Sequence, residues 1–128
     1  RSELARALDR ATARGVDALL VGALPFSITE LRHEIAAYAL ERRIPLAAGT
    51  GAGSWAEAGA LVAFGSDQLE TFRRLAYFVD RILKGAKPGE IPIEQPTKFE
   101  TILNLKTAKA LGLTIPPSVM SRATRVIE

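Results

Sequence analysis

The sequence predicts an α/β fold in which helices cover a doubly wound parallel sheet. Three short and almost uninterrupted apolar runs, at residues 16–22, 44–48 and 59–65, have the composition of strands that are buried on both faces. Segments with helical apolar spacing alternate with these runs along the chain. Such an alternation is typical of a parallel sheet with helices packed against both of its faces.

The first two predicted helices cover residues 2–14 and 27–43. Leucines, isoleucines and alanines at three-to-four-residue spacing give each segment one apolar face. Gly15 follows the first helix, at the position where a left-handed residue is favoured. The second helix begins with Ser-Ile-Thr-Glu, a capping box in which Ser27 accepts a hydrogen bond from the amide of Glu30.

The longest predicted helix covers residues 67–84. It opens with Asp-Gln-Leu-Glu, a second capping box that starts at Asp67, and Gly85 follows as its stop. The apolar residues of this helix recur at helical spacing, and they are predicted to face inward. They are Leu69, Phe72, Leu75, Ala76, Val79 and Leu83.

The rest of the chain predicts an extended segment, a strand and short helices. Residues 87–96 are proline-rich and extended, whereas residues 99–105 alternate like a strand. Asn104 can cap a short helix over residues 105–111, which Gly112 closes. The final segment begins at a proline pair and is predicted to hold one more helical turn.

The glycine-rich motif GTGAGSW, at residues 49–55, raises the question of a phosphate loop. The spacing of Gly49, Gly51 and Gly53 is not that of a dinucleotide fingerprint, and no Walker lysine follows. The run from Gly53 to the next strand at Ala60 is too short for a long crossover helix, so we predict a loop. It is either a plain turn or the edge of a ligand cleft, since ligands of open α/β sheets bind beyond the carboxyl ends of strands.

Two apolar segments near strand ends, at Trp55 and at residues 24–26, are compatible with either a structural role or a ligand-binding role. Trp55, the only tryptophan, either packs on the core or offers a stacking surface to a ligand. Leu24, Pro25 and Phe26 follow the first strand, where an anionic ligand group can meet the amides of the next helix. The structural alternative is a hydrophobic staple in which Phe26 packs on Leu31.

The residues that chemistry most often requires are scarce. The chain has no cysteine and one histidine, His33, which is predicted to face solvent, and it has no Gly-x-Ser-x-Gly elbow. We therefore predict no catalytic residues, no metal site and no cofactor, and we do not expect an enzyme. The net charge of +3 is spread along the chain with adjacent basic pairs only at residues 42–43 and 73–74, so neither nucleic acid in general nor DNA is predicted as a partner.

Residues 81–128 closely resemble the C-terminal end of a family of bacterial ABC transporter substrate-binding proteins of the tryptophan/tyrosine type. The segments ILKGAKP, EQPTKFE and NLKTAKALGLTIPPS are similar to sequence motifs of that family. Upstream, DALLV, RRIPLAAG and EAGALVAFGSD follow the order of the family, so the resemblance covers essentially the whole chain.

The resemblance implies a type I periplasmic binding protein fold, in which two α/β lobes joined by three crossings close on a solute. Residues 1–64 would belong to the second, C-terminal lobe. Residues 65–98 would cross the hinge and supply a helix and an extended segment that pack on the first lobe, which this chain lacks. Residues 99–128 would form the C-terminal strand and helix. Surfaces left uncovered without the first lobe would favour a homodimer.

The resemblance also implies a function. The protein would be the periplasmic or extracytoplasmic component of an ABC-type importer, with a small-molecule solute, such as an amino acid, and an ABC permease as its partners. The residues expected to line the cleft are Leu24, Pro25, Phe26, Gly49, Thr50, Gly51, Trp55, Ser66 and Asp67.

Two departures from the family lie at this expected cleft. Family members often carry a bulkier and more polar segment in place of residues 49–54, and commonly have Tyr-Gly-Pro where this chain has Phe64, Gly65 and Ser66. The solute therefore need not be an aromatic amino acid. The alternative function is that of the ligand-sensing domain of a transcription regulator, which shares this fold, and a small α/β enzyme is disfavoured because the chain has no catalytic set.

Overall fold

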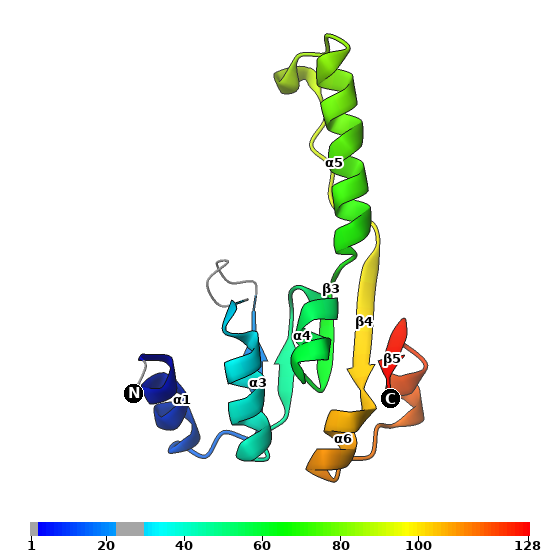
Figure 1. Cartoon of the computed structure of the whole chain (residues 1–128). Helices are drawn as coiled ribbons and strands as arrows, with labels where there is room; N and C mark the ends of the chain where they lie inside the picture. The colour runs from blue at the N-terminus through cyan, green and yellow to red at the C-terminus, as the bar shows by residue number, and fades with distance from the viewer. Residues whose placement is uncertain (1–2, 23–29) are drawn as a thin grey trace.

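The structure, a computed structural model of the chain, describes residues 3–22 and 30–128. Five strands form one sheet in the spatial order β1-β2-β3-β4-β5 (Figure 1). They are β1 (Leu19–Val21), β2 (Leu46–Ala48), β3 (Val62–Ser66), β4 (Phe99–Asn104) and β5 (Arg125–Ile127). The short strand β5 was not predicted, because three residues are too few for an alternating pattern to show.

The sheet is mostly parallel, and the predicted α/β class is confirmed. Strands β1, β2 and β3 pair in parallel, as do β4 and β5, whereas β3 and β4 are antiparallel. The antiparallel pair follows from the path of the chain. After β3 the chain leaves the sheet in a long helix, turns, and comes back beside β3 from the same edge (Figure 1).

The described helices lie in segments that the sequence predicts to be helical, except for one that begins inside the glycine-rich motif. They are α1 (Glu3–Thr12), α3 (Arg32–Glu41), α4 (Ala52–Ala58), α5 (Gln68–Leu83), α6 (Leu105–Leu111) and α7 (Pro117–Met120), with a 3-10 turn at Pro88–Glu90. The capping box at Ser27 lies outside the described residues. No helix in the described part of the chain combines the length and the apolar character needed to cross a membrane.

Helix α4 corrects the prediction for the glycine-rich motif. A loop was predicted, but a helix begins at Ala52, inside the motif, and carries the chain from β2 to the parallel strand β3. Both ends of this helix are set by left-handed glycines, Gly51 at φ 53° and Gly59 at φ 117°. A seven-residue helix is long enough for this connection because the two strands are adjacent.

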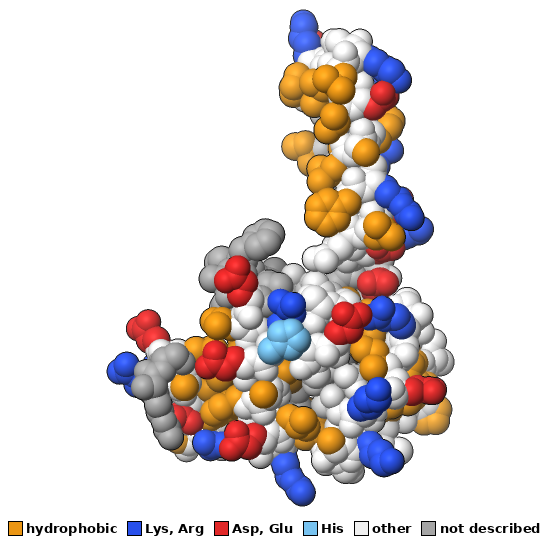
Figure 2. All heavy atoms as spheres, viewed as in Figure 1, with side chains coloured by type: hydrophobic (Ala, Val, Ile, Leu, Met, Phe, Trp, Pro, Cys, Tyr) orange, Lys and Arg blue, Asp and Glu red, His pale blue; other side chains and the backbone are white. Residues whose placement is uncertain are grey.

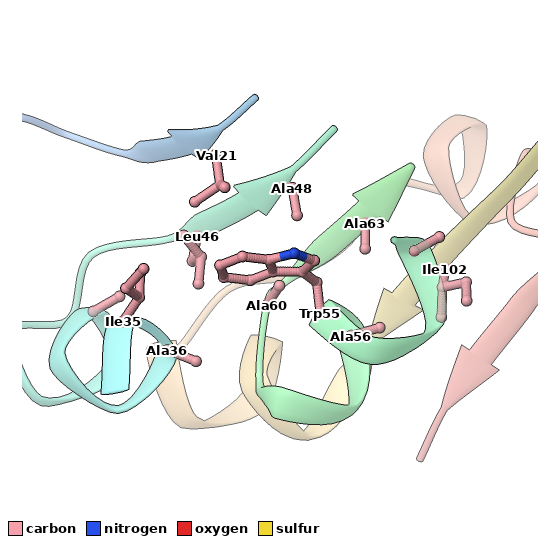
Figure 3. Packing of buried hydrophobic residues seen from close by; sticks show 12 residues of the cluster. Val21, Ile35, Ala36, Leu46, Ala48, Trp55, Ala56, Ala60, Ala63 and Ile102 are labelled. Carbon is pink, nitrogen blue, oxygen red and sulfur yellow. The ribbon is translucent and has the colours of Figure 1, made fainter. Parts of the chain in front are cut away.

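The core lies between one face of the sheet and helices α3 and α4 (Figure 3). Alanines supply much of this interface. Ala48 and Ala63 project from neighbouring strands, and Ala52 and Ala56 project from α4. These small side chains let the helix approach the sheet closely, and larger residues such as Trp55 fill the remaining space at close-packed density.

Helix α5 is exposed, and so is part of the opposite face of the sheet. The helix projects from the body of the chain (Figure 1), and none of its residues is buried. The apolar residues predicted to face inward form an exposed stripe along it, visible in Figure 2. On the sheet, Leu20 is 76% exposed. The prediction that α5 faces a core is therefore wrong within this chain.

A buried polar contact joins α6 to α4. Asn104 ends β4 and caps α6, as predicted, since its side-chain oxygen accepts from the amide of Thr107 at 3.0 Å. The amide nitrogen of the same side chain donates to the carbonyl of Ala56 at 2.9 Å. The Thr107 hydroxyl donates to the carbonyl of Gly59 at 3.0 Å. The start of α6 thus supplies a donor to the carbonyl of Gly59 and a second donor to the carbonyl of Ala56, which also accepts from the amide of Gly59 at 3.1 Å.

Replacing Asn104 with alanine is expected to lower the free energy of unfolding by about 1–3 kcal/mol, because the cap is lost and the buried carbonyl of Ala56 loses one of its two donors. Asn104→Ser keeps a capping oxygen and is expected to cost less. Urea denaturation of the full-length protein, followed by circular dichroism, measures both. Equal losses in the two variants would contradict an energetic role for the cap, and an Asn104→Ser variant without any loss would contradict a separate role for the contact with Ala56.

Candidate functional site

An open hollow of about 550 Å³ lies at the carboxyl ends of β2 and β3. The structure brings four of the residues predicted from the sequence to its wall: Gly49, Thr50, Gly51 and Ser66. The other residues that line it were not predicted as site residues, and they are Phe64, Gly65, Gln68, Gln95, Pro96 and Phe99.

The turn after β2 is held in place by backbone contacts. The amide of Gly49 donates to the carbonyl of Val21 at 2.8 Å, which ties the turn to the end of β1. Gly51 has a positive φ and its carbonyl accepts from the Ser54 hydroxyl at 2.9 Å. A side chain at Gly65 would lie only 3.2 Å from the nitrogen of Gly51. The turn can therefore rest directly on β3 because Gly65 has no side chain.

Two aromatic rings form the apolar part of the wall. Phe64 and Phe99 come from the antiparallel strands β3 and β4 and lie on the same face of the sheet. Their ring centroids are 5.5 Å apart, and the ring planes are parallel to within 1°. The side chains are 49% and 51% exposed. The sequence placed Phe64 at the expected cleft but did not indicate Phe99 or the contact between them, because only the pairing of β3 with β4 brings the two residues together.

The chain leaves the sheet and returns to it beside the hollow. The amide of Asp67 donates to the carbonyl of Lys98 at 3.0 Å, which joins the outgoing and the returning segment. The carboxylate of Asp67 accepts from the amide of Glu70 at 3.1 Å and so caps α5, as its capping box predicts. Asp67 lines a neighbouring groove between α5 and the returning segment, and not the hollow itself.

An ion pair fastens the returning segment to α5. Arg74 donates from Nε and Nη2 to both carboxylate oxygens of Glu94, at 2.6 and 2.5 Å. These hydrogen bonds lower the pKa of Glu94 and raise the pKa of Arg74 from their ordinary values. The guanidinium also lies 3.9 Å from the centre of the Tyr77 ring. Glu94 is followed by Gln95 and Pro96, so the pair lies next to two residues of the hollow.

The other predicted site residues lie elsewhere. Trp55 is 1% exposed and packs between α4 and the sheet (Figure 3), so the structure favours the packing alternative for this side chain. Its indole nitrogen is buried without a hydrogen-bond partner in the described structure. Leu24, Pro25 and Phe26 lie outside the described residues.

The chemistry of the hollow is that of a neutral binding surface. Among the residues that line it, none carries a charge, and hydrogen bonds can come from Thr50, Ser66, Gln68 and Gln95. The described residues hold no group of three or more potential metal ligands. This arrangement can bind a small molecule by apolar contact and by neutral hydrogen bonds.

Comparison with known proteins gives a family and a fold. The sequence model of the family described as "ABC transporter substrate binding protein" matches residues 3–127. No match was found among curated proteins.

Three solved structures show the fold, and each is similar to this chain over part of its own length. A conserved domain protein from Vibrio cholerae is 24% identical, with a TM-score of 0.83, and the match covers 94% of this chain and 40% of that chain. The ABC domain in complex with L-Trp from Streptococcus pneumoniae is 26% identical, with a TM-score of 0.80, over 91% of this chain and 39% of that chain.

The third structure is the ligand-free, open form of a substrate-binding protein with adhesive properties from Clostridium difficile. It is 21% identical, with a TM-score of 0.65, over 98% of this chain and 40% of that chain. The chain therefore spans about two fifths of the length of the solved structures it matches.

Proposed function

The chain belongs to the ABC transporter substrate-binding protein family, and from this premise we propose that it supplies one lobe and the hinge segments of an extracytoplasmic solute-binding protein. The observation that carries the proposal is the hollow at the carboxyl ends of β2 and β3. It lies where the chain leaves the sheet after Ser66. In open α/β sheets, ligands bind at this edge.

The proposed solute contacts are the residues of the turn after β2 and of the end of β3. Gly49, Thr50, Gly51 and Ser66 line the hollow and offer backbone groups and two hydroxyls. Asp67 acts here by capping α5 at the edge of the cleft. Trp55 packs close to the turn, since a Cβ atom added at Gly51 would lie 3.5 Å from the Cδ1 atom of its indole ring.

Leu24, Pro25 and Phe26 are proposed to reach the same cleft. They follow β1, which lies beside β2 and runs parallel to it, so that the carboxyl ends of these strands meet at one edge of the sheet. Ligands in open α/β sheets gather outside this edge.

The proposed partner of α5 is the other lobe of the same protein. Residues 1–64 would form the C-terminal lobe, residues 65–98 would cross the hinge and pack on the other lobe, and residues 99–128 would complete the C-terminal segment. The exposed apolar stripe on α5 supports this division, because large apolar patches of soluble proteins are usually covered by a partner surface. Without the other lobe, a second copy of the chain would compete for the stripe and favour a homodimer.

The proposed role of the whole protein is to capture a small solute and deliver it to an ABC permease. The cleft would close over the solute by movement at the two neighbouring crossings, which Asp67 and Lys98 join. An amino acid is the solute class that we propose first, since a family structure with a similar fold holds L-Trp. No catalytic step is needed for this role.

The full-length protein is expected to melt at a higher temperature when its solute is present. Binding to the native state stabilises it by about 2.7 kcal/mol when the solute concentration is one hundred times the dissociation constant. A thermal-shift screen with the twenty amino acids tests this, and calorimetric titration confirms the hits. The control is D-glucose, which is not an amino acid. If no amino acid raises the melting temperature, the proposed solute class is wrong.

A further inference from the structure

We propose that Phe64 and Phe99 form an aromatic platform that recognises an uncharged, planar part of the solute; this rests on the solute-binding function proposed above. The platform would make these two residues determinants of solute selectivity. Phe99 was not predicted as a site residue, and Phe64 was placed at the expected cleft only as part of a departure from the family.

The two rings are arranged so that they form one continuous apolar surface. The rings are parallel to within 1°, with centroids 5.5 Å apart, so their edges and faces together present a wide apolar surface. About half of each side chain is accessible, although both come from strands in the sheet. Exposed paired aromatic rings at the wall of a hollow suit a flat apolar partner, because ring stacking adds to the gain from apolar burial.

The platform lies in an uncharged hollow, since none of the residues that line the hollow carries a charge. Nearby charged groups have other contacts: the Asp67 carboxylate accepts from the amide of Glu70, Lys98 lies 3.6 Å from Glu70, and Arg74 pairs with Glu94. A charged group of the solute buried against the platform would lack a counter-charge, which is costly. The platform therefore selects for a neutral group.

Two glutamines lie at the wall of the same hollow. Gln68, on the first turn of α5, and Gln95, on the returning segment, both line the hollow together with the two rings. A primary amide both donates and accepts, so these side chains can bind the polar edge of a flat group whose face rests on the rings. The ion pair of Glu94 with Arg74 fixes the segment that carries Gln95.

The test compares solutes that differ in planarity and charge. In the full-length protein, Phe64→Leu and Phe99→Leu keep apolar volume and remove the ring. Calorimetric titration with L-phenylalanine, L-tryptophan, L-leucine and L-glutamate gives the dissociation constants. Each variant is expected to weaken binding of the two ring-bearing probes about two- to tenfold and to change binding of L-leucine less than twofold. The expected order for the unsubstituted protein places L-glutamate last.

The control variant is Phe72→Leu, which makes the same substitution at a phenylalanine that is 67% exposed on α5 and does not line the hollow. It is expected to leave the ratio of affinities unchanged. If ring-bearing probes bind and the Phe64 and Phe99 variants leave that ratio unchanged while lowering the melting temperature of the solute-free protein, the pair is a structural contact and the platform is wrong. Preference for L-glutamate would also overturn it. If neither ring-bearing probe binds although another amino acid raises the melting temperature in the thermal-shift screen, the platform is wrong and the amino-acid function stands; if no amino acid raises it, the proposed function itself is wrong.

Discussion

Replacement of Trp55 by alanine is expected to lower the free energy of unfolding by about 3–5 kcal/mol, which is the usual cost of deleting a large aromatic side chain from a core. The side chain is 1% exposed, and it is the largest of the fully buried residues. The same cluster contains several short side chains, among them Ala48, Ala52 and Ala63. They cannot extend into the space that the indole leaves, so we expect a cavity and a cost near the upper end.

Trp55→Phe is the matched control. The phenyl ring retains most of the apolar contact and removes the indole nitrogen, which is buried without a partner. Removal of this nitrogen leaves no other polar group without a hydrogen-bond partner. Trp55→Phe is therefore expected to lower the free energy of unfolding clearly less than Trp55→Ala does. Urea denaturation followed by far-ultraviolet circular dichroism measures both, because the signal does not depend on tryptophan. A loss below about 1 kcal/mol for Trp55→Ala would contradict the core assignment.

Gly65→Ala is expected to lower both the stability of the protein and its affinity for the solute. The added Cβ would lie 3.2 Å from the nitrogen of Gly51, 3.4 Å from the nitrogen of Ala52 and 3.5 Å from the carbonyl carbon of Thr50. All three are backbone atoms, so no side-chain rotation relieves the contact. Forcing β3 and the turn apart is expected to cost about 1–3 kcal/mol.

The same displacement would move Thr50 and Gly51, which line the hollow. We therefore expect a higher dissociation constant in calorimetric titration with the best amino acid from the thermal-shift screen. Gly89→Ala is the control, because a Cβ at that position meets nothing within 4 Å. It is expected to leave both quantities unchanged. A Gly65→Ala variant with unaltered urea midpoint and affinity would show that the turn does not need to rest on β3.

Several elements could be read directly from the sequence because local residues determine them. The cap of α5 at Asp67, the cap of α6 at Asn104 and the left-handed stop at Gly112 all formed as predicted. Each depends on a hydrogen bond or a backbone angle within a few residues of chain. The family resemblance was also visible in the sequence, and the match over residues 3–127 confirms it.

The candidate site was only partly predictable. The glycines of the motif indicated a turn at a strand end, and Gly49 and Gly51 do line the hollow. The helix that begins at Ala52 was not predicted, because the few residues between Gly53 and the next strand were judged too short for a crossover helix. Trp55 had two uses that the sequence left open, since an indole among small residues suits both a core and a binding surface.

The sequence by itself determined the α/β class, the boundaries of most helices and the family. These features depend on local periodicity, on helix caps and on characteristic sequence motifs. Only the tertiary structure decided that Trp55 is a core residue, that α5 stands clear of the sheet, and that Phe64 lies against Phe99. The physical reason is that the pairing of β3 with β4 joins residues separated by the whole of α5 and its returning segment. Contacts between segments so far apart in the chain leave no periodic signal in either of them.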